Sequence, residues 1–172
     1  FDDGDNGLAA GGEDYVVRIW QRDDNGTPGV FGDDTGTAVL AEMVFDVTNG
    51  NGTFAGYEAV GTLQAGHRFL PLASPLVLAA GSYTVTGEYF WASEMNFNAG
   101  LGGTPGPTDG GGGLLSFVGT ARYARDAHGV FPVNVDGGPA NRYGAGSFIY
   151  VPEPATAGLL LLAAGAAVRR RR

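Results

Sequence analysis

Short segments in which apolar and polar residues alternate recur along the first 150 residues. The clearest is Ser82–Trp91, with one side formed by Tyr83, Val85, Tyr89 and Trp91 and the other by Ser82, Thr84, Thr86 and Glu88. A side-chain period of two is typical of a β-strand with one buried face. We therefore expect a strand here, with its aromatic side facing inward and its hydroxyl-bearing side outward.

Two other segments have the same character. Tyr15–Gln21 is rich in β-branched and aromatic residues, and Leu40–Val47 places Ala41, Met43, Phe45 and Val47 on one face. Weaker apolar runs occupy residues 68–72, 76–78, 114–118, 130–135 and 147–151. These runs predict about seven to nine strands, and no window before residue 151 has a convincing helical repeat.

The 31 glycines punctuate these runs without a collagen-like period, which is typical of a β domain with many turns. Two packed antiparallel sheets bury alternating faces of this kind. The predicted fold is therefore all-β: an antiparallel β-sandwich, jelly-roll-like or immunoglobulin-like, followed by one short C-terminal apolar helix. We expect one domain over residues 1–150 and a separate tail over residues 151–172.

The tail contains an apolar run of 14 residues, Ala155–Val168, between Pro154 and four arginines. Such a helix is roughly 21 Å long, against a hydrocarbon core of about 30 Å, so it spans a bilayer only with help from arginine snorkelling. The arginines also place the tail end on the cytoplasmic side and the body across the membrane. A buried helix would show a polar face, and this run has none.

Three features in order resemble the PEP-CTERM sorting signal of Gram-negative bacteria. They are the motif Pro152, Glu153 and Pro154; the apolar run with Leu159, Leu160, Leu161 and Leu162; and the cluster Arg169, Arg170, Arg171 and Arg172. The resemblance implies recognition by an exosortase, cleavage near the Pro-Glu-Pro motif, transient inner-membrane association and delivery to the cell surface or the extracellular space. We also expect a secretory signal upstream of Phe1.

The net charge and the cysteine content of the chain exclude some classes of partner and some kinds of chemistry. Without Glu153 and the four terminal arginines, the chain keeps 6 basic and 17 acidic residues, a net charge of about −11. Phosphate recognition needs a basic face, so nucleic acid and anionic membranes are not expected partners. The absence of cysteine removes disulfides and thiol chemistry from an exported protein.

Acidic residues gather with glycine and asparagine in Gln21–Gly36, which contains Asp23, Asp24, Asp33 and Asp34. Calcium prefers six to eight oxygen ligands on a bendable loop, so a Ca²⁺ site is one hypothesis. The stretch does not have EF-hand spacing. Because the same residues also form tight turns, ordinary turn chemistry is the favoured interpretation.

Catalytic motifs are weak. Asp34-Thr35-Gly36 spells the aspartic-protease triplet, but a single copy would need a symmetric dimer, and the turn interpretation is favoured. Carboxylate pairs for glycoside hydrolysis can be drawn from Glu42, Glu58, Glu88 and Glu94, as in any acidic chain. We therefore expect a non-enzymatic protein and keep a secreted glycan-active hydrolase as the alternative.

Aromatic rings are the remaining candidates. Trp20 falls on the face of its strand opposite Tyr15, Val17 and Ile19, and Trp91 lies near a glycine-rich stretch. Such rings can stack on sugars, although core packing is the commoner role. The sequence thus predicts an exported surface or matrix protein associated with exopolysaccharide, with a calcium-binding structural protein as a further alternative.

Overall fold

The structure is a computed structural model that describes residues 13–49, 53–59, 62–89, 114–116, 119, 121–125, 127–137, 146 and 148–149. These residues form strands and, within these ranges, no helix. The strands are β1 (Tyr15–Asp23), β2 (Thr35–Phe45), β3 (Thr53–Ala59), β4 (Thr62–Phe69), β5 (Ser82–Glu88), β6 (Arg122–Tyr123) and β7 (Asn134–Val135). The all-β expectation is confirmed for this part of the chain.

Contacts divide the chain into two units, residues 1–108 with 117–148, and residues 109–116 with 149–172. All seven strands belong to the first unit. Within the described ranges, no helix is long and apolar enough to cross a bilayer.

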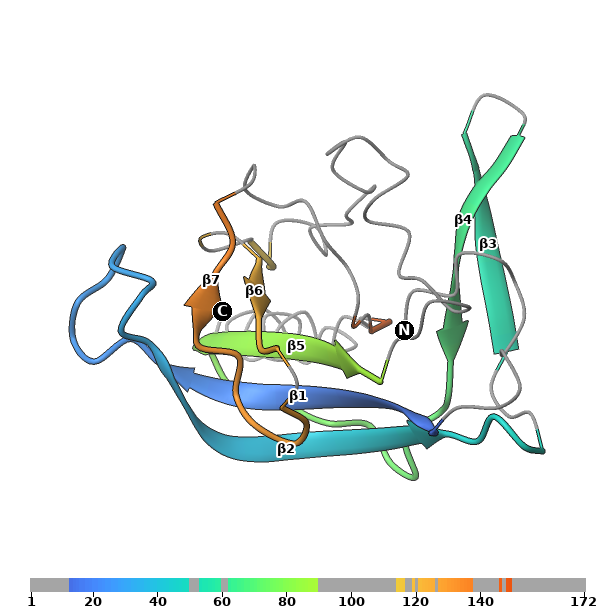
Figure 1. The fold of residues 1–172 in the computed structure, drawn as a ribbon, viewed down its shortest axis with the longest axis horizontal. Coiled ribbons are helices and arrows are strands. Elements are labelled where there is room, and N and C mark those ends of the chain that lie inside the picture. Colours follow the sequence, from blue (N-terminus) through green and yellow to red (C-terminus); the bar gives the residue numbers. More distant parts are fainter. Residues whose placement is uncertain are drawn as a thin grey trace, which may run out of the picture. The chain divides into compact units, whose positions relative to one another are not determined.

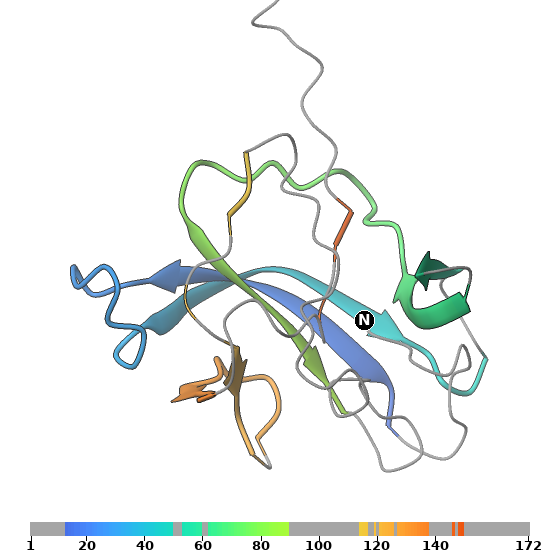
Figure 2. The same ribbon diagram turned by 90° about the horizontal axis from the view of Figure 1, so that it is seen from above.

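A three-stranded antiparallel sheet, in the order β2-β1-β5, organises the first unit (Figure 1). Its central strand β1 pairs along its whole length with β2, from Tyr15 opposite Phe45 to Asp23 opposite Thr35. Seen from above, β5 crosses β1 at an angle, as expected for a twisted sheet (Figure 2). The β-branched and aromatic residues of β1 suit this central position.

The core lies on one face of this sheet. Tyr15, Val17, Phe45 and Val47 form a buried cluster, and Met43, Leu70, Val85 and Tyr89 pack against it. The three positions Met43, Phe45 and Val47 are those that alternation assigned to one side of Leu40–Val47, so that face is confirmed. Full burial of each large apolar side chain contributes about 1.5–3 kcal/mol to folding.

Strand β2 departs from regular pairing at two places. The register with β1 shifts between Ile19 and Trp20 and again between Gln21 and Arg22, which leaves Leu40 and Thr37 as extra residues on β2. Bulges of this kind bend an edge strand and redirect its side chains. They explain why alternation read from the sequence holds for the later part of β2 but not across its beginning.

Two consecutive turns connect β1 to β2. Thr27 N donates to Asp24 O at 2.9 Å, with Asn25 and Gly26 at φ values of 51° and 73°, which are the features of a type I′ turn. Val30 N then donates to Thr27 O at 3.0 Å, and Gly29 at a φ of 92° follows Pro28, as in a type II turn. The Asn-Gly and Pro-Gly pairs are therefore the local cause of the loop's shape.

The other strands form two small antiparallel pairs. β3 and β4 make a hairpin in which Thr53 lies opposite Phe69, and β6 pairs with β7 through Arg122 and Tyr123. The hairpin was not predicted as such, because glycines at residues 56 and 66 interrupt its alternation.

The strand predictions fare differently along the chain. The prediction over 15–21 is confirmed as β1, that over 40–47 is confirmed for residues 40–45 of β2, and that over 82–91 is confirmed for residues 82–88 as β5. The prediction over 76–78 is wrong: residues 70–81 contain no strand, and Pro71 and Pro75 cannot donate to a ladder. The run 130–135 is a strand only at its last two residues. Residues 114–116 and 148–149 are not in strands, and the rest of those two runs lies outside the described residues, as does the predicted C-terminal helix.

Asp46 closes the turn after β2 and gives a test of this geometry. Its carboxylate accepts hydrogen bonds from the side chain and backbone of Asn49 and from the backbone of Thr48, and these bonds lower the pKa of Asp46. A carbon-detected NMR titration should therefore give a midpoint below the value of about 3.9 for a free aspartate. Because the folded state holds the proton less tightly, this contribution to stability is complete above pH of about 4 and is lost as the pH falls through the folded pKa.

Asn49→Ala is the matched variant for this titration, because it removes the bond with the largest effect on the pKa of Asp46. The midpoint should move upward in that variant. An identical midpoint in both proteins would contradict the assignment.

Candidate functional site

The face of the sheet opposite the core carries polar and aromatic side chains. Arg18, Trp20 and Arg22 alternate along β1, with Glu42 opposite Arg18 on β2 and Thr86 opposite Arg18 on β5. We call this surface the polar face. Sequence alternation placed the polar side of β5 outward, and here the structure corrects it: the Glu88 side chain is only 10% exposed. Gly129 contacts this face at Glu88, Phe131 contacts it at Trp20, and Arg122 binds Asp34 beside it.

Asp34, at the end of the β1–β2 loop, is the most buried charge described. Its side chain is 1% exposed, and its Oδ2 atom forms ion pairs with Arg22 and, at 2.7 Å, with Nη2 of Arg122. The three residues are named here the Asp34 cluster. Two guanidinium groups share one carboxylate, so the cluster carries a formal charge of +1. Burial of charge on this scale is costly unless each ion is paired and hydrogen-bonded.

An aromatic ring lies next to the guanidinium group of each arginine in the cluster. The guanidinium of Arg22 lies 5.3 Å from the ring centre of Phe31, and that of Arg122 lies 5.5 Å from the ring centre of Phe131. Arg122 Nη1 also donates to Pro132 O at 3.4 Å. Cation–π contacts of partly desolvated arginines contribute about 0.5–2 kcal/mol each. They offset part of the cost of burying the second guanidinium.

Two glycines make room for these rings. A Cβ atom on Gly36 would lie 2.5 Å from the ring of Phe131, and one on Gly119 would lie 2.8 Å from the ring of Phe31. Both distances are too short for any other residue without movement. Phe131 also meets Trp20 edge to face, with ring centres 6.0 Å apart. Phe131 therefore contacts both Arg122 of the Asp34 cluster and Trp20.

A second ionic group lies farther along the polar face. Arg18 Nε lies 2.6 Å from Glu42 Oε2, and Arg18 Nη1 lies 2.5 Å from Glu88 Oε1. Desolvation lowers the pKa of Arg18, but Glu88 and Glu42 raise it by more, so its pKa lies above the usual value. Both carboxylates thus bind one guanidinium, and neither stands as a free acid or nucleophile.

Hydrogen bonds and ring contacts connect Trp20 and Glu88 to the chain that covers them. The indole N–H of Trp20 donates to Thr86 Oγ1 at 3.1 Å, and Thr86 Oγ1 is 3.4 Å from Glu88 Oε1. The other carboxylate oxygen of Glu88 accepts the backbone N–H of Gly129 at 2.7 Å. Next to it, Tyr89 stacks on His128 with ring centres 3.9 Å apart, and Tyr89 has an unusual φ of 69°.

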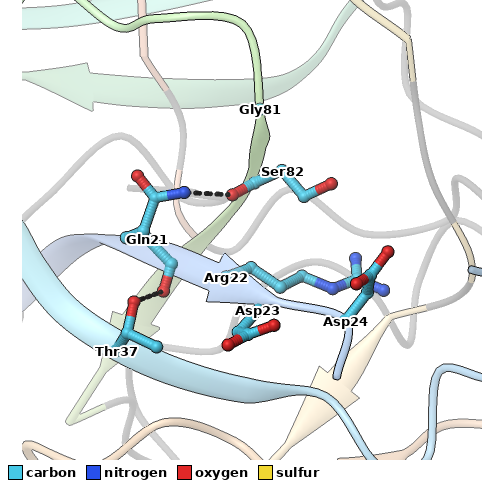
Figure 3. Close-up of a pocket in the computed structure, with 7 residues that line it drawn as sticks. All are labelled: Gln21, Arg22, Asp23, Asp24, Thr37, Gly81 and Ser82. Carbon is cyan, nitrogen blue, oxygen red and sulfur yellow. Dashed lines mark hydrogen bonds between the residues drawn. The ribbon is translucent and has the colours of Figure 1, made fainter. Parts of the chain in front are cut away.

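A polar pocket of about 360 Å³ lies where β1 ends and where β2 and β5 begin (Figure 3). Its lining consists of Gln21, Arg22, Asp23, Asp24, Thr37, Gly81 and Ser82. Thr37, the extra residue of one β2 bulge, turns its hydroxyl toward Gln21 O at 3.4 Å, and the Gln21 amide donates to Ser82 O at 3.4 Å. The pocket is open to solvent and rich in hydroxyl, amide and carboxylate groups. It suits a small hydroxyl-bearing ligand better than an apolar one.

Three acidic residues of the β1–β2 loop accept hydrogen bonds from other residues of that loop. Asp23 Oδ1 accepts from the Asn25 backbone N–H at 2.9 Å, and Asp24 Oδ1 accepts from Gly26 at 3.0 Å. Asp33 Oδ2 accepts from the Thr27 hydroxyl at 2.7 Å. The first two of these bonds are those of Asx turns, and the third joins the two ends of the loop.

Asp34 is held by arginines rather than placed beside the other three carboxylates. In the described part of the chain, no group of three or more histidine, aspartate or glutamate side chains is arranged to hold a metal ion. The four aspartates of the calcium hypothesis are thus not gathered into one ligand set in the structure.

Of the two tryptophans proposed for sugar stacking, Trp20 lies in the described part of the chain. Trp20 lies on the predicted face of β1 but is only 7% exposed, so its ring does not offer a free face to a sugar. Trp91 lies outside the described residues. The same holds for the sorting motif Pro152–Pro154, the leucines 159–162 and the arginines 169–172.

Sequence reasoning missed Arg22, Arg122 and Phe131. Arg22 sits at an alternating position of β1, so its placement on the polar face could have been predicted. The pairing of Arg122 with Asp34 could not, because these two residues are 88 positions apart in the chain. Comparison with known proteins finds no matching family model, no matching curated protein and no matching solved structure.

Replacement of Asp34 by Asn should strongly destabilise the protein. The change removes the carboxylate that two buried guanidinium groups share, and breaking a buried ion pair by removing one partner costs about 3–5 kcal/mol. Asp33→Asn is the matched control in the same loop, since Asp33 is exposed, and it should cost less than about 1 kcal/mol. Urea denaturation followed by circular dichroism measures both. Equal losses in the two variants would show that the Asp34 cluster has no special role.

Proposed function

We propose that the chain is a non-enzymatic exported protein of the cell surface or extracellular matrix, sorted by an exosortase through residues 151–172. The observation that carries the proposal is the order of three features in the tail: Pro152-Glu153-Pro154, a 14-residue apolar run and four arginines. An apolar run this short is a poor permanent anchor. It suits a temporary tether that is removed after recognition, as in other tripartite C-terminal signals.

The proposed architecture of the exported body is a β-sandwich, with the apolar helix of the tail after it. The three-stranded sheet has a core on one face and a covered polar face on the other, which is compatible with packing between layers. Without disulfides, such a body relies on packing and on internal ion pairs such as the Asp34 cluster.

The partner that we propose for the body is exopolysaccharide, bound at the polar pocket. Thr37 and Ser82 offer hydroxyls, Gln21 offers an amide, and Asp23 and Asp24 offer carboxylates. Groups of these three kinds are able to form hydrogen bonds with sugar hydroxyls. The acidic body disfavours polyanions such as nucleic acid, so a neutral glycan is the better match.

A glycan-active hydrolase is not the function that we propose. Of the glutamates considered for catalysis, Glu42 and Glu88 have described side chains, and both bind Arg18. Glu58 lies on β3. A glycosidase needs one carboxyl group as acid and another as nucleophile or base, with the substrate between them. The guanidinium of Arg18 instead links these two.

Mass spectrometry of the mature protein from an exosortase-bearing host tests the sorting proposal. The mature C-terminus should lie near Pro154, with the arginines absent. Replacement of Arg169–Arg172 by glutamine should leave the tail uncut, because the positive charge that fixes its orientation is gone. Recovery of wild-type protein from the inner membrane with Arg172 still present would refute the proposal.

The glycan proposal has its own test. Retention on exopolysaccharide from the same host should fall by about tenfold when Thr37 and Ser82 are both replaced by alanine, since each lost hydrogen bond is worth about 0.5–1.5 kcal/mol. Thr48→Ala removes an exposed hydroxyl outside the pocket and should bind as wild type does. Unchanged retention in the double variant would exclude the pocket as the binding site.

A further inference from the structure

The chain that covers the polar face is a segment with its own small sheet. It comprises residues 121–125 and 127–136, including β6 and β7, and is called the strap below. Asp136 N donates to Ala121 O at 2.8 Å and Arg122 pairs with Val135, so the two halves of the strap are joined to each other. The strap is therefore a local unit that can keep its own bonds apart from the sheet.

The strap contacts the sheet, and residues just outside its strands, through ionic, aromatic and hydrogen-bonding groups. Arg122 binds Asp34, Phe131 packs on Trp20 and Gly36, Gly129 N donates to Glu88, and His128 stacks on Tyr89. Most of these contacts are ionic, aromatic or hydrogen-bonded. The valines of the strap at residues 130, 133 and 135 are exposed and add little hydrophobic stabilisation.

The ion pair that attaches the strap contributes little for the number of atoms it involves, because Arg122 shares the Asp34 carboxylate with Arg22. Arg22 and Asp34 form a neutral pair on the sheet and its loop without any help from the strap. Arg122 of the strap lies in the same site, where its side chain is 4% exposed and pairs with the carboxylate that already binds Arg22. The desolvation of that second guanidinium offsets much of what its contacts contribute.

We propose that the strap opens as a unit while the three-stranded sheet stays folded, and that opening uncovers Trp20 as a cryptic aromatic surface. The uncovered surface consists of the Trp20 ring between Arg18 and Arg22 of β1, with Thr86 and Glu88 beside it on β5. The strap thus acts as a conformational gate over the polar face. This inference is independent of how the tail is processed and of whether the pocket binds a glycan.

The structure supplies reporters for each part. The Gly129 amide, bonded to Glu88, reports detachment of the strap, and the Trp20 indole N–H, bonded to Thr86, reports uncovering of the polar face. Backbone amides of the β1–β2 ladder report the sheet. Regions that open locally exchange amide hydrogens through openings that cost less than global unfolding.

Hydrogen exchange of the full chain, followed by NMR, tests the proposal in the wild-type protein. The Gly129 amide and the Trp20 indole should exchange with a common opening free energy that is lower than that of the β1–β2 ladder. Trp91→Phe identifies the Trp20 indole signal, because the chain has two tryptophans. Equal opening free energies for all three reporters would overturn the proposal, since strap and sheet would then unfold together.

Two variants loosen the strap in different ways. Arg122→Ala removes its ionic attachment but leaves the Arg22–Asp34 pair, and Gly36→Ala drives a Cβ atom into the Phe131 ring. Each should raise exchange at Gly129 and the Trp20 indole by about tenfold or more and leave the ladder within about twofold. The controls are Arg125→Ala, an exposed strap arginine that contacts Tyr123, and Gly32→Ala, which meets no atom within 4 Å.

The controls should change none of the reporters. If Gly129 exchanges faster in both variants while the Trp20 indole does not, the strap opens without uncovering Trp20 and the gate is refuted. If the ladder accelerates equally with the strap in both variants, the two form one cooperative unit and the proposal is likewise overturned.

Discussion

Burying a carboxylate away from water is costly unless positive charge is paired with it. Asp34 is paired with two arginines that come from different parts of the chain. Arg22 is the penultimate residue of the central strand, and Arg122 belongs to the small β6–β7 pair. These buried contacts connect the β1–β2 loop and the later segment to the central strand. Phe31 and Phe131 then pack against the guanidinium groups, and Gly36 and Gly119 leave space for the rings.

The two faces of the central sheet are stabilised by different forces. On one face, Tyr15, Val17 and Phe45 lose contact with water, and area-proportional burial drives the packing. On the other face, charges and hydrogen bonds must be matched partner by partner, because an unmatched buried group is costly. The first face tolerates exchange among apolar residues of similar volume. The second depends on particular side chains such as Arg18 and Glu88.

This difference explains how much could be predicted from the sequence. Alternation identified β1, β5 and most of β2, and it assigned Met43 and Phe45 to the buried side, because a hydrophobic face leaves a local pattern. It also placed Trp20 on the opposite face. It could not show that Trp20 is covered, since Phe131 arrives from far along the chain. Asp23, Asp24 and Asp33 were correctly favoured as turn residues, and Asp34 was not. Nothing local distinguishes buried Asp34 from exposed Asp33.

The space shared by Gly36 and Phe131 also has an evolutionary consequence. The two residues are distant in sequence but fill one volume, so a larger side chain at one position requires a smaller one at the other. Related sequences should therefore show coupled substitution at this pair, and likewise at Gly119 and Phe31. Independent drift at either position of a pair would mean that the lineage had abandoned this packing.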